Sequence, residues 1–290
     1  MTSTCHIDFE TRSAVDIKKC GADIYARHPS TDILCLGFKF DEEAPQLIKY
    51  GEQLPPRVKS HIEKGGKFIA HNAAFELAIW NYVCVPVYGW PPLRVEQTDC
   101  TMARAYAMAI PGSLEKAAAA LGIDKQKDMA GNRVMVKLAT PKEILPWGEV
   151  VWWEPEEVPE LFEKLYNYCL QDVEVEAELD RRLLQLSQME QSVWQLDQKI
   201  NQRGIQIDIK AVKAAIEIVE TEKLRLDRRM REVTDNQVAT CTATKQLTDW
   251  IEYQGVSVDG VAKADVTEML SRPDLPFVIR NALALRQEAA

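Results

Sequence analysis

The sequence lacks any apolar run long enough for a helix to cross a membrane. The N-terminus also lacks a basic region followed by an apolar core, so no secretory signal peptide is expected. We therefore expect a cytoplasmic protein without a membrane partner. Its 290 residues are 46% hydrophobic and 27% charged, which is typical of one large or two modest globular domains.

Patterns for disulfide bonds and for zinc ligands are missing as well. The seven cysteines are an odd number and include no Cys-x-x-Cys pair. Scattered single cysteines are typical of reduced thiols in the cytosol. We expect neither a disulfide framework nor a zinc site.

The chain has no excess of positive charge, and its formal net charge is −9. This argues against a surface that coats nucleic acid in a general way. An enzyme that acts on nucleic acid is still open. Bound divalent cations reverse the sign of the local field, whereas a bare acidic site would repel phosphate.

The first part of the chain alternates between strand-like and helix-like runs. Such alternation indicates an α/β fold with a mixed sheet flanked by helices. Asn72 and Asp99 are each expected to cap a helix through their side chains. Strands are predicted at 5–10, 33–40, 46–50, 67–71 and 95–98, and helices at 56–64, 73–83, after 99 and at 113–121.

The second part is expected to be mostly helical after an irregular insertion at 124–158, which is rich in Pro and Trp. Helical spacing predicts one helix over 160–201, a short strand at 205–209, and a long helix over 210–233 with a mixed-charge, solvated surface. We expect one domain over 1–186 and a smaller helical domain over 187–290.

Asp8 and Glu10 end the first predicted strand and are one residue apart. Alternate residues of a strand project from the same face. Two neighbouring carboxylates repel each other unless a cation lies between them, and Mg²⁺ prefers such oxygen ligands. Taken alone, the pair is more simply explained as a polar strand end or a helix cap.

Two further acidic motifs follow. Glu76 lies in the first turns of the helix after Asn72, where the helix dipole favours a carboxylate. Tyr168 and Asp172 are four residues apart, so a helix presents them on one face. The alternatives are an ordinary helix start, and a core tyrosine beside a solvated aspartate.

The three motifs in this order resemble the DEDD 3′→5′ exonuclease superfamily, in the branch with Tyr in its third motif. The motifs are Asp8-Phe-Glu10-Thr11, Asn72-Ala-Ala-Phe75-Glu76 and Tyr168-Cys-Leu-Gln-Asp172. The context of the second motif and the segment Lys127–Gly131 are similar to proofreading domains of phage-type family A DNA polymerases. The resemblance implies an RNase H-like fold with a five-stranded sheet.

The resemblance also implies roles for individual residues. Asp8, Glu10, Glu76 and Asp172 would hold two divalent ions, Mg²⁺ or Mn²⁺, with Asp8 bridging them, and Tyr168 would orient the attacking water. Thr11 and Asn72 would contact the terminal nucleotide of single-stranded DNA or a DNA 3′ end. Phe9 and Phe75 would pack against its sugar and base, or else belong to the core.

One departure from the family pattern lies in the second motif, which usually ends in Asp. Glu76 is longer by one carbon–carbon bond, roughly 1.5 Å. Two alternative functions stay open. One is an RNA-trimming exonuclease of the same superfamily, because no motif reports on the 2′-hydroxyl. The other is a non-catalytic subunit that docks a separate chain with a family A polymerase palm.

The C-terminal part resembles the segment that follows the exonuclease domain in family A polymerases. The similar stretches are 200–208 and 279–286. Neither palm carboxylates nor a nucleotide-binding helix is recognised after them. The chain is therefore not expected to extend DNA by itself.

Overall fold

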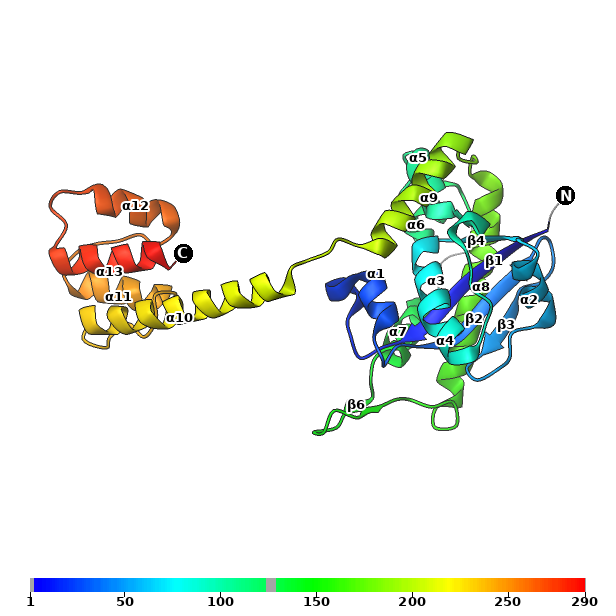
Figure 1. Ribbon diagram of the computed structural model, residues 1–290, viewed down its shortest axis with the longest axis horizontal. Helices are drawn as coiled ribbons and strands as arrows, with labels where there is room; N and C mark the ends of the chain where they lie inside the picture. The colour runs from blue at the N-terminus through cyan, green and yellow to red at the C-terminus, as the bar shows by residue number, and fades with distance from the viewer. Residues whose placement is uncertain (1–2, 124–128, 290) are drawn as a thin grey trace. The chain divides into compact units, whose positions relative to one another are not determined.

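The computed structural model describes residues 3–123 and 129–289 (Figure 1). A mixed sheet has the strand order β3-β2-β1-β4-β5. β1 pairs antiparallel with β2 and parallel with β4. The predicted α/β class, a mixed five-stranded sheet flanked by helices, is confirmed and is consistent with an RNase H-like fold. The strands are β1 (Thr4–Arg12), β2 (Asp32–Phe40), β3 (Gln46–Lys49), β4 (Lys67–Ala70) and β5 (Thr98–Cys100).

The helices follow the strands in alternation and then dominate the C-terminal part. They are α1 (Ile17–Arg27), α2 (Pro56–Glu63), α3 (Ala73–Ile79), the π-helix η1 (Trp80–Cys84), α4 (Val85–Tyr88), the 3-10 helix η2 (Val95–Gln97), α5 (Thr101–Ala107), α6 (Leu114–Ala120), α7 (Met129–Ala139), α8 (Pro159–Arg182), α9 (Gln188–Arg203), α10 (Ile209–Val233), α11 (Thr244–Tyr253), α12 (Lys263–Ser271) and α13 (Phe277–Glu288).

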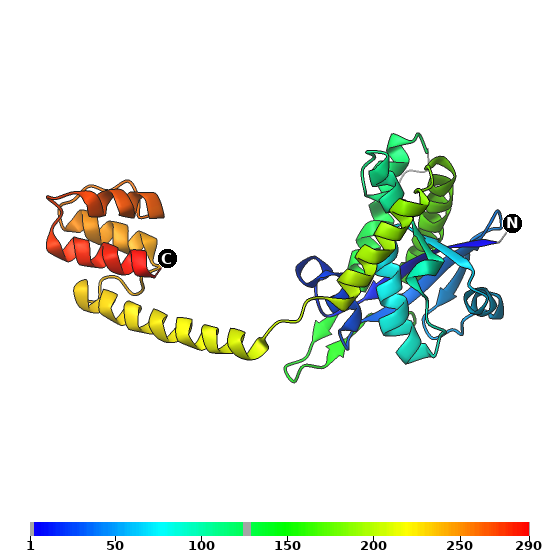
Figure 2. The same ribbon diagram turned by 45° about the horizontal axis from the view of Figure 1, so that its top comes forward.

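The central strand β1 presents different chemistry on its two faces. Ile7 and Phe9 belong to a large apolar core that includes Trp80. The alternate residue His6 instead faces α8 and lies 3.2 Å from the Asp180 carboxylate. α8 lies against β1 and β2, as the two views indicate (Figures 1 and 2). The polar face of β1 is therefore the face that α8 covers.

Gly37 of β2 permits this close packing. A Cβ atom at this position would lie 2.8 Å from a methyl group of Val173 and 2.9 Å from the sulfur of Cys169. Contacts this short are strongly repulsive, and overpacking shifts the backbone. Gly37 is the register partner of Asp8. The closest approach of α8 to the sheet therefore lies beside the first acidic motif.

The helix predicted over 160–201 is in fact two helices. The N–H groups at the start of α9 are capped by Ser187, whose side chain accepts from the Glu190 backbone while Glu190 accepts from the Ser187 backbone. The buried guanidinium of Arg104 accounts for the break, because it donates to the backbone carbonyls of Leu183 and Leu184. These carbonyls are therefore bonded outside the helix, which spacing alone could not indicate.

Several other expectations differ from the structure. Residues 129–139 of the expected irregular insertion form α7, and a short hairpin of β6 (Glu143–Ile144) and β7 (Val150–Val151) follows. α1 was not predicted. Residues 205–208 form no strand, and residue 209 begins α10. Part of the segment Lys127–Gly131 lies outside the described residues.

The two predicted side-chain caps are also wrong in mechanism. Asn72 precedes α3 but makes no side-chain cap; its backbone is left-handed, with φ 73° and ψ 48°. Asparagine tolerates this conformation better than most residues. Asp99 lies within β5, and Cys100 is the cap residue of α5. The Asp99 carboxylate instead lies 3.9 Å from the Arg104 guanidinium.

The chain divides into two compact units, residues 1–204 and 205–290. This division lies later than the expected boundary after residue 186, because α9 packs on the first unit. Gln191 donates to the Thr98 carbonyl at 3.1 Å, and Lys199 lies 2.6 Å from Glu96. The second unit has its own core, formed by α10 to α13. Within the described residues, no helix combines the length and apolarity needed to span a membrane.

Arg104 offers a direct test of how α8 is held. Its side chain is fully buried, and it also bonds the carboxylate and the carbonyl of Asp180. Replacement by Met removes the donor to three backbone carbonyls and leaves the Asp180 carboxylate with His6 alone. We therefore expect Arg104→Met to lower the free energy of unfolding by about 3–5 kcal/mol in urea titrations. Arg57→Ala, which removes an exposed pairing with Glu43, should change it little. Equal effects of the two variants would contradict this account.

Candidate metal centre

Three of the four predicted carboxylates converge at the junction of β1 and α8. Asp8 and Glu10 project from the same face of β1, and Asp172 projects from α8. One carboxylate oxygen from each of the three side chains lies within 4.8 Å of the other two, and among residues 3–123 and 129–289 they form the one such group that could hold a metal ion. Glu10 is buried, while Asp8 and Asp172 are partly exposed. The group is thus reachable from solvent on one side.

Local packing sets the position of the two elements. The Cys169 thiol donates to the backbone carbonyl of Asp8 at 3.4 Å. Cys169 precedes Asp172 by almost one helical turn, and Gly37 beside it provides the room for the contact. The distance between Asp172 and the β1 carboxylates is therefore fixed by backbone and core atoms.

Glu76 lies outside this group of three, but its pKa is affected by the Asp8 carboxylate. Its side chain is only 3% exposed, and one carboxylate oxygen has no hydrogen-bond partner. Burial and the neighbouring Asp8 raise the pKa of Glu76 well above its usual value. A buried acceptor without a donor is costly unless something else binds it. A cation held between Glu76 and Asp8 would supply that partner.

Tyr168 joins the group through Asp172. Its side chain is buried, and its hydroxyl is hydrogen-bonded to the Asp172 carboxylate. Burial and the carboxylates of Asp172 and Glu10 raise the pKa of Tyr168 above its usual value. The phenol therefore stays protonated at neutral pH, where it can orient a polar group but cannot act as a base.

The four residues predicted to bind substrate differ in burial and in the face on which they lie. Thr11 is buried at the end of β1, and Phe75 is partly exposed next to Glu76. Asn72 is partly exposed at the start of α3. Phe9 packs against Trp80 on the opposite face of β1 from the carboxylates, with ring centroids 5.9 Å apart. Phe9 is therefore a core residue.

Glu176 was missed by the sequence analysis. It lies one helical turn beyond Asp172, is 1% exposed, and has one carboxylate oxygen without a hydrogen bond. Burial, followed by Asp8 and Glu76, raises the pKa of Glu176 well above its usual value. The four-residue spacing of Tyr168, Asp172 and Glu176 was a signal, since it places all three on one helical face.

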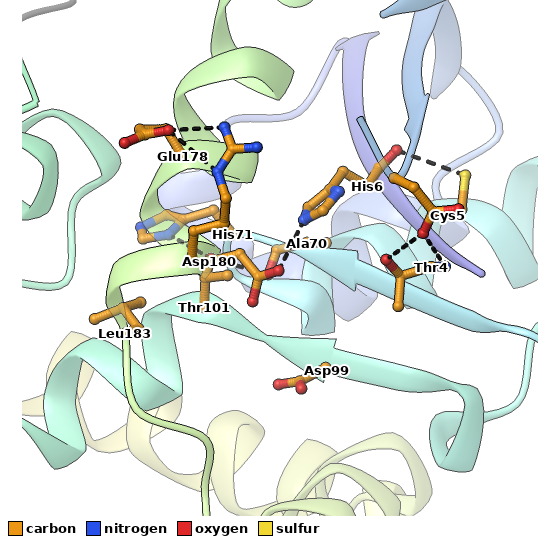
Figure 3. A network of polar contacts seen from close by, with 12 residues as sticks. Thr4, Cys5, His6, Ala70, His71, Asp99, Thr101, Glu178, Asp180 and Leu183 are labelled. Atoms are coloured by element: carbon orange, nitrogen blue, oxygen red, sulfur yellow. Dashed lines mark hydrogen bonds and ion pairs between the residues drawn. The ribbon is translucent and has the colours of Figure 1, made fainter. Parts of the chain in front are cut away.

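A separate polar network lies farther along the same face of α8 (Figure 3). Asp180 interacts with His6 of β1 and with Arg104 of α5. Burial alone would raise the pKa of Asp180, but hydrogen bonds from His6 and Arg104 outweigh it, and the pKa is lowered. Nearby, His71 Nδ1 lies 2.9 Å from the Thr101 hydroxyl and Nε2 lies 2.8 Å from the Gly112 carbonyl. These residues join α5 and the β4–α3 connection to the rest of the unit.

The donor set of the candidate site indicates the type of metal. Carboxylate oxygens from Asp8, Glu10, Asp172 and Glu76 are hard ligands. Such sets favour Mg²⁺ or Mn²⁺ over zinc or copper, which prefer nitrogen and sulfur ligands. The orphaned oxygen of Glu76 fits a cation as well, so the residues present are compatible with a divalent metal centre.

Glu176 predicts a pH dependence of stability. Its folded-state pKa lies above the ordinary value of 4.5, so between these pKa values the folded state holds a proton that the unfolded state has released. Stability from this group is present below pH 4.5 and is lost as pH rises toward the folded-state pKa. In EDTA, the gain in unfolding free energy from Glu176→Gln should therefore grow as pH rises above 4.5. A gain independent of pH, or an equal one from exposed Glu163→Gln, would contradict this.

Comparison with known proteins gives one informative match. The chain is 34% identical over 294 residues to a DNA polymerase of Bacillus phage SP02, and the match covers 99% of this chain and 44% of that polymerase. The chain thus spans less than half the length of this relative. No protein-family model matches the chain. Over nearly its whole length, the chain is similar to a phage DNA polymerase.

Proposed function

We propose that this chain is a metal-dependent 3′→5′ exonuclease that removes nucleoside monophosphates from DNA 3′ ends. The observation that carries the proposal is the convergence of Asp8, Glu10 and Asp172, with Tyr168 bonded to Asp172. Similarity to a phage DNA polymerase supports DNA as the substrate and proofreading during replication as the role.

The carboxylates have distinct places in this proposal. Asp8, Glu10 and Asp172 would hold one divalent ion, and Glu76 together with Asp8 would hold a second, consistent with the raised pKa of the buried Glu76 carboxyl. Two divalent ions supply an activated water and neutralise charge on the phosphoryl oxygens. Without them the clustered acids would repel the phosphodiester.

Tyr168 orients the water that attacks the terminal phosphodiester. Its hydroxyl is held by Asp172 and stays protonated, so it positions the water and takes no proton from it. The last nucleotide of the DNA strand lies against Thr11, Asn72 and the Phe75 ring. Thr11 follows Glu10 in the sequence, and Asn72 and Phe75 precede Glu76. A stacked ring beside a cationic centre suits a single strand of any sequence.

The test uses single-stranded DNA labelled at the 5′ end, which reports stepwise shortening from the 3′ end. With Mg²⁺ or Mn²⁺, the wild type should release 5′-monophosphates. Asp8→Asn and Asp172→Asn should lower the rate by at least about 100-fold, because even groups that only support metal ligands contribute about 10- to 100-fold. Tyr168→Phe should lower it less, since the metal ligands remain.

Glu163→Gln is the matched control, because Glu163 is an exposed acid on α8, the helix that carries Asp172. It should leave the rate unchanged, and all variants should melt cooperatively. Equal shortening by wild type, Asp8→Asn and Asp172→Asn would refute the proposal. A matched RNA oligomer decides between the DNA enzyme and the RNA-trimming alternative.

One observation favours a second role, docking to a separate polymerase chain. α10 exposes an apolar stripe of four residues at helical spacing, with exposed fractions of 44–64%: Ile209, Val212, Ile216 and Val219. Exposed apolar stripes of this kind mark interaction surfaces. The SP02 relative extends well beyond the matched region. We propose that a palm-bearing polymerase segment covers this stripe.

The docking proposal is tested by adding the remaining part of the SP02 polymerase in trans and measuring binding by calorimetry. Ile216→Glu should weaken binding by about tenfold or more, because a charge would be placed in an apolar contact. Glu217→Gln, a neighbouring exposed position, should bind as the wild type does. Absence of binding at micromolar concentration would rule the docking out.

A further inference from the structure

α1, which the sequence analysis did not predict, contacts the candidate site through one side chain. Tyr25 is 6% exposed. Its hydroxyl shares a hydrogen bond of 2.9 Å with the hydroxyl of Thr11, the residue after Glu10. Its ring lies 6.1 Å from the ring of Phe75, the residue before Glu76, at an interplanar angle of 44°. Tyr25 thus contacts both residues that flank the acidic motifs.

Tyr25 is itself held firmly. The Thr31 hydroxyl donates to the Tyr25 carbonyl at 2.6 Å and lies 2.7 Å from the hydroxyl of Ser13, the residue after β1. At the end of α1, the Arg27 guanidinium lies 3.9 Å from the centre of the Tyr82 ring. α1 is therefore attached to β1 on one side and to η1 on the other.

A threonine hydroxyl on its own occupies several staggered rotamers. The hydrogen bond between Thr11 and Tyr25 selects one rotamer of Thr11 before any ligand binds, and the ring contact restricts Phe75 in the same way. Groups ordered before binding lose less entropy when the ligand arrives. A rigid contact of this kind lowers the cost of binding without touching the reacting atoms.

We propose that Tyr25 is a positioning residue for the 3′-terminal nucleotide, which it serves by fixing the Thr11 hydroxyl and the Phe75 ring. The inference rests on the proposed exonuclease function. On this proposal, α1 lies beside the bound terminal nucleotide and orders the residues that contact it. Tyr25 acts on binding, because the carboxylates that would carry the chemistry lie on β1, α3 and α8.

The test separates binding from catalysis. Tyr25→Phe keeps the ring and removes the hydroxyl, so KM for single-stranded DNA should rise about 2- to 12-fold, the range expected for one hydrogen bond. kcat should change less than about twofold, because the groups that act on the phosphate are untouched. In a double-mutant cycle, Tyr25→Phe should add little to Thr11→Val, because both remove the same bond.

Tyr166→Phe is the matched control, since Tyr166 is also 6% exposed but belongs to α8 and to a different core cluster. It should leave KM unchanged. A direct binding titration of fluorescent single-stranded DNA in Ca²⁺ gives a second readout that does not require turnover. There the dissociation constant of Tyr25→Phe should rise by the same factor as KM.

The outcomes distinguish this inference from the proposed function. If the wild type shortens DNA but Tyr25→Phe changes neither KM nor the dissociation constant, the positioning role is refuted and the exonuclease stands. A fall in melting temperature and kcat with constant KM would likewise show a merely structural tyrosine. A wild type that neither binds nor shortens DNA refutes both.

Discussion

The mutual repulsion of clustered carboxylates is the constraint on which this structure depends. Asp8, Glu10 and Asp172 bring their oxygens within 4.8 Å of one another, and Glu76 and Glu176 lie buried close by. Burying part of such a concentration of negative charge costs free energy. The fold must hold these groups together against their repulsion, and a cation is the natural partner for them.

The packing of α8 on the sheet holds the acidic side chains together against this repulsion. Gly37 lets α8 approach β2 beside Asp8, and Cys169 contacts the Asp8 backbone at the same point. Farther along, Asp180 and Arg104 fix the end of the helix. These contacts join backbone and buried side chains, so the acids cannot separate without unfolding part of the core. Stability elsewhere in the unit thus maintains a locally unfavourable arrangement.

Much of the fold followed from local patterns. Four of the five strands, β1 to β4, were predicted, because runs such as 33–40 are apolar, β-branched or aromatic, and end at turn residues. The strand predicted at 95–98 is wrong, since residues 95–97 form the 3-10 helix η2 and β5 begins at Thr98. The same reasoning failed where a distant group decided the outcome. The break before Ser187 depends on Arg104, some eighty residues earlier in the chain, and helical spacing continues across the break. The side-chain cap expected for Asn72 was replaced by a left-handed backbone, because local preference allows both.

The sequence by itself determined which site residues share a face of one element. Asp8 and Glu10 share a strand face, and Tyr168 and Asp172 share a helix face. Period-two and helical spacing act within single elements, so they are readable without a fold. Only the tertiary structure decided which elements meet. Phe9 packs in the core against Trp80, and Glu176 is buried near the acidic residues. The unpredicted α1 contacts Thr11 and Phe75 through Tyr25. These are contacts between residues distant in sequence, and they depend on how packed surfaces fit together.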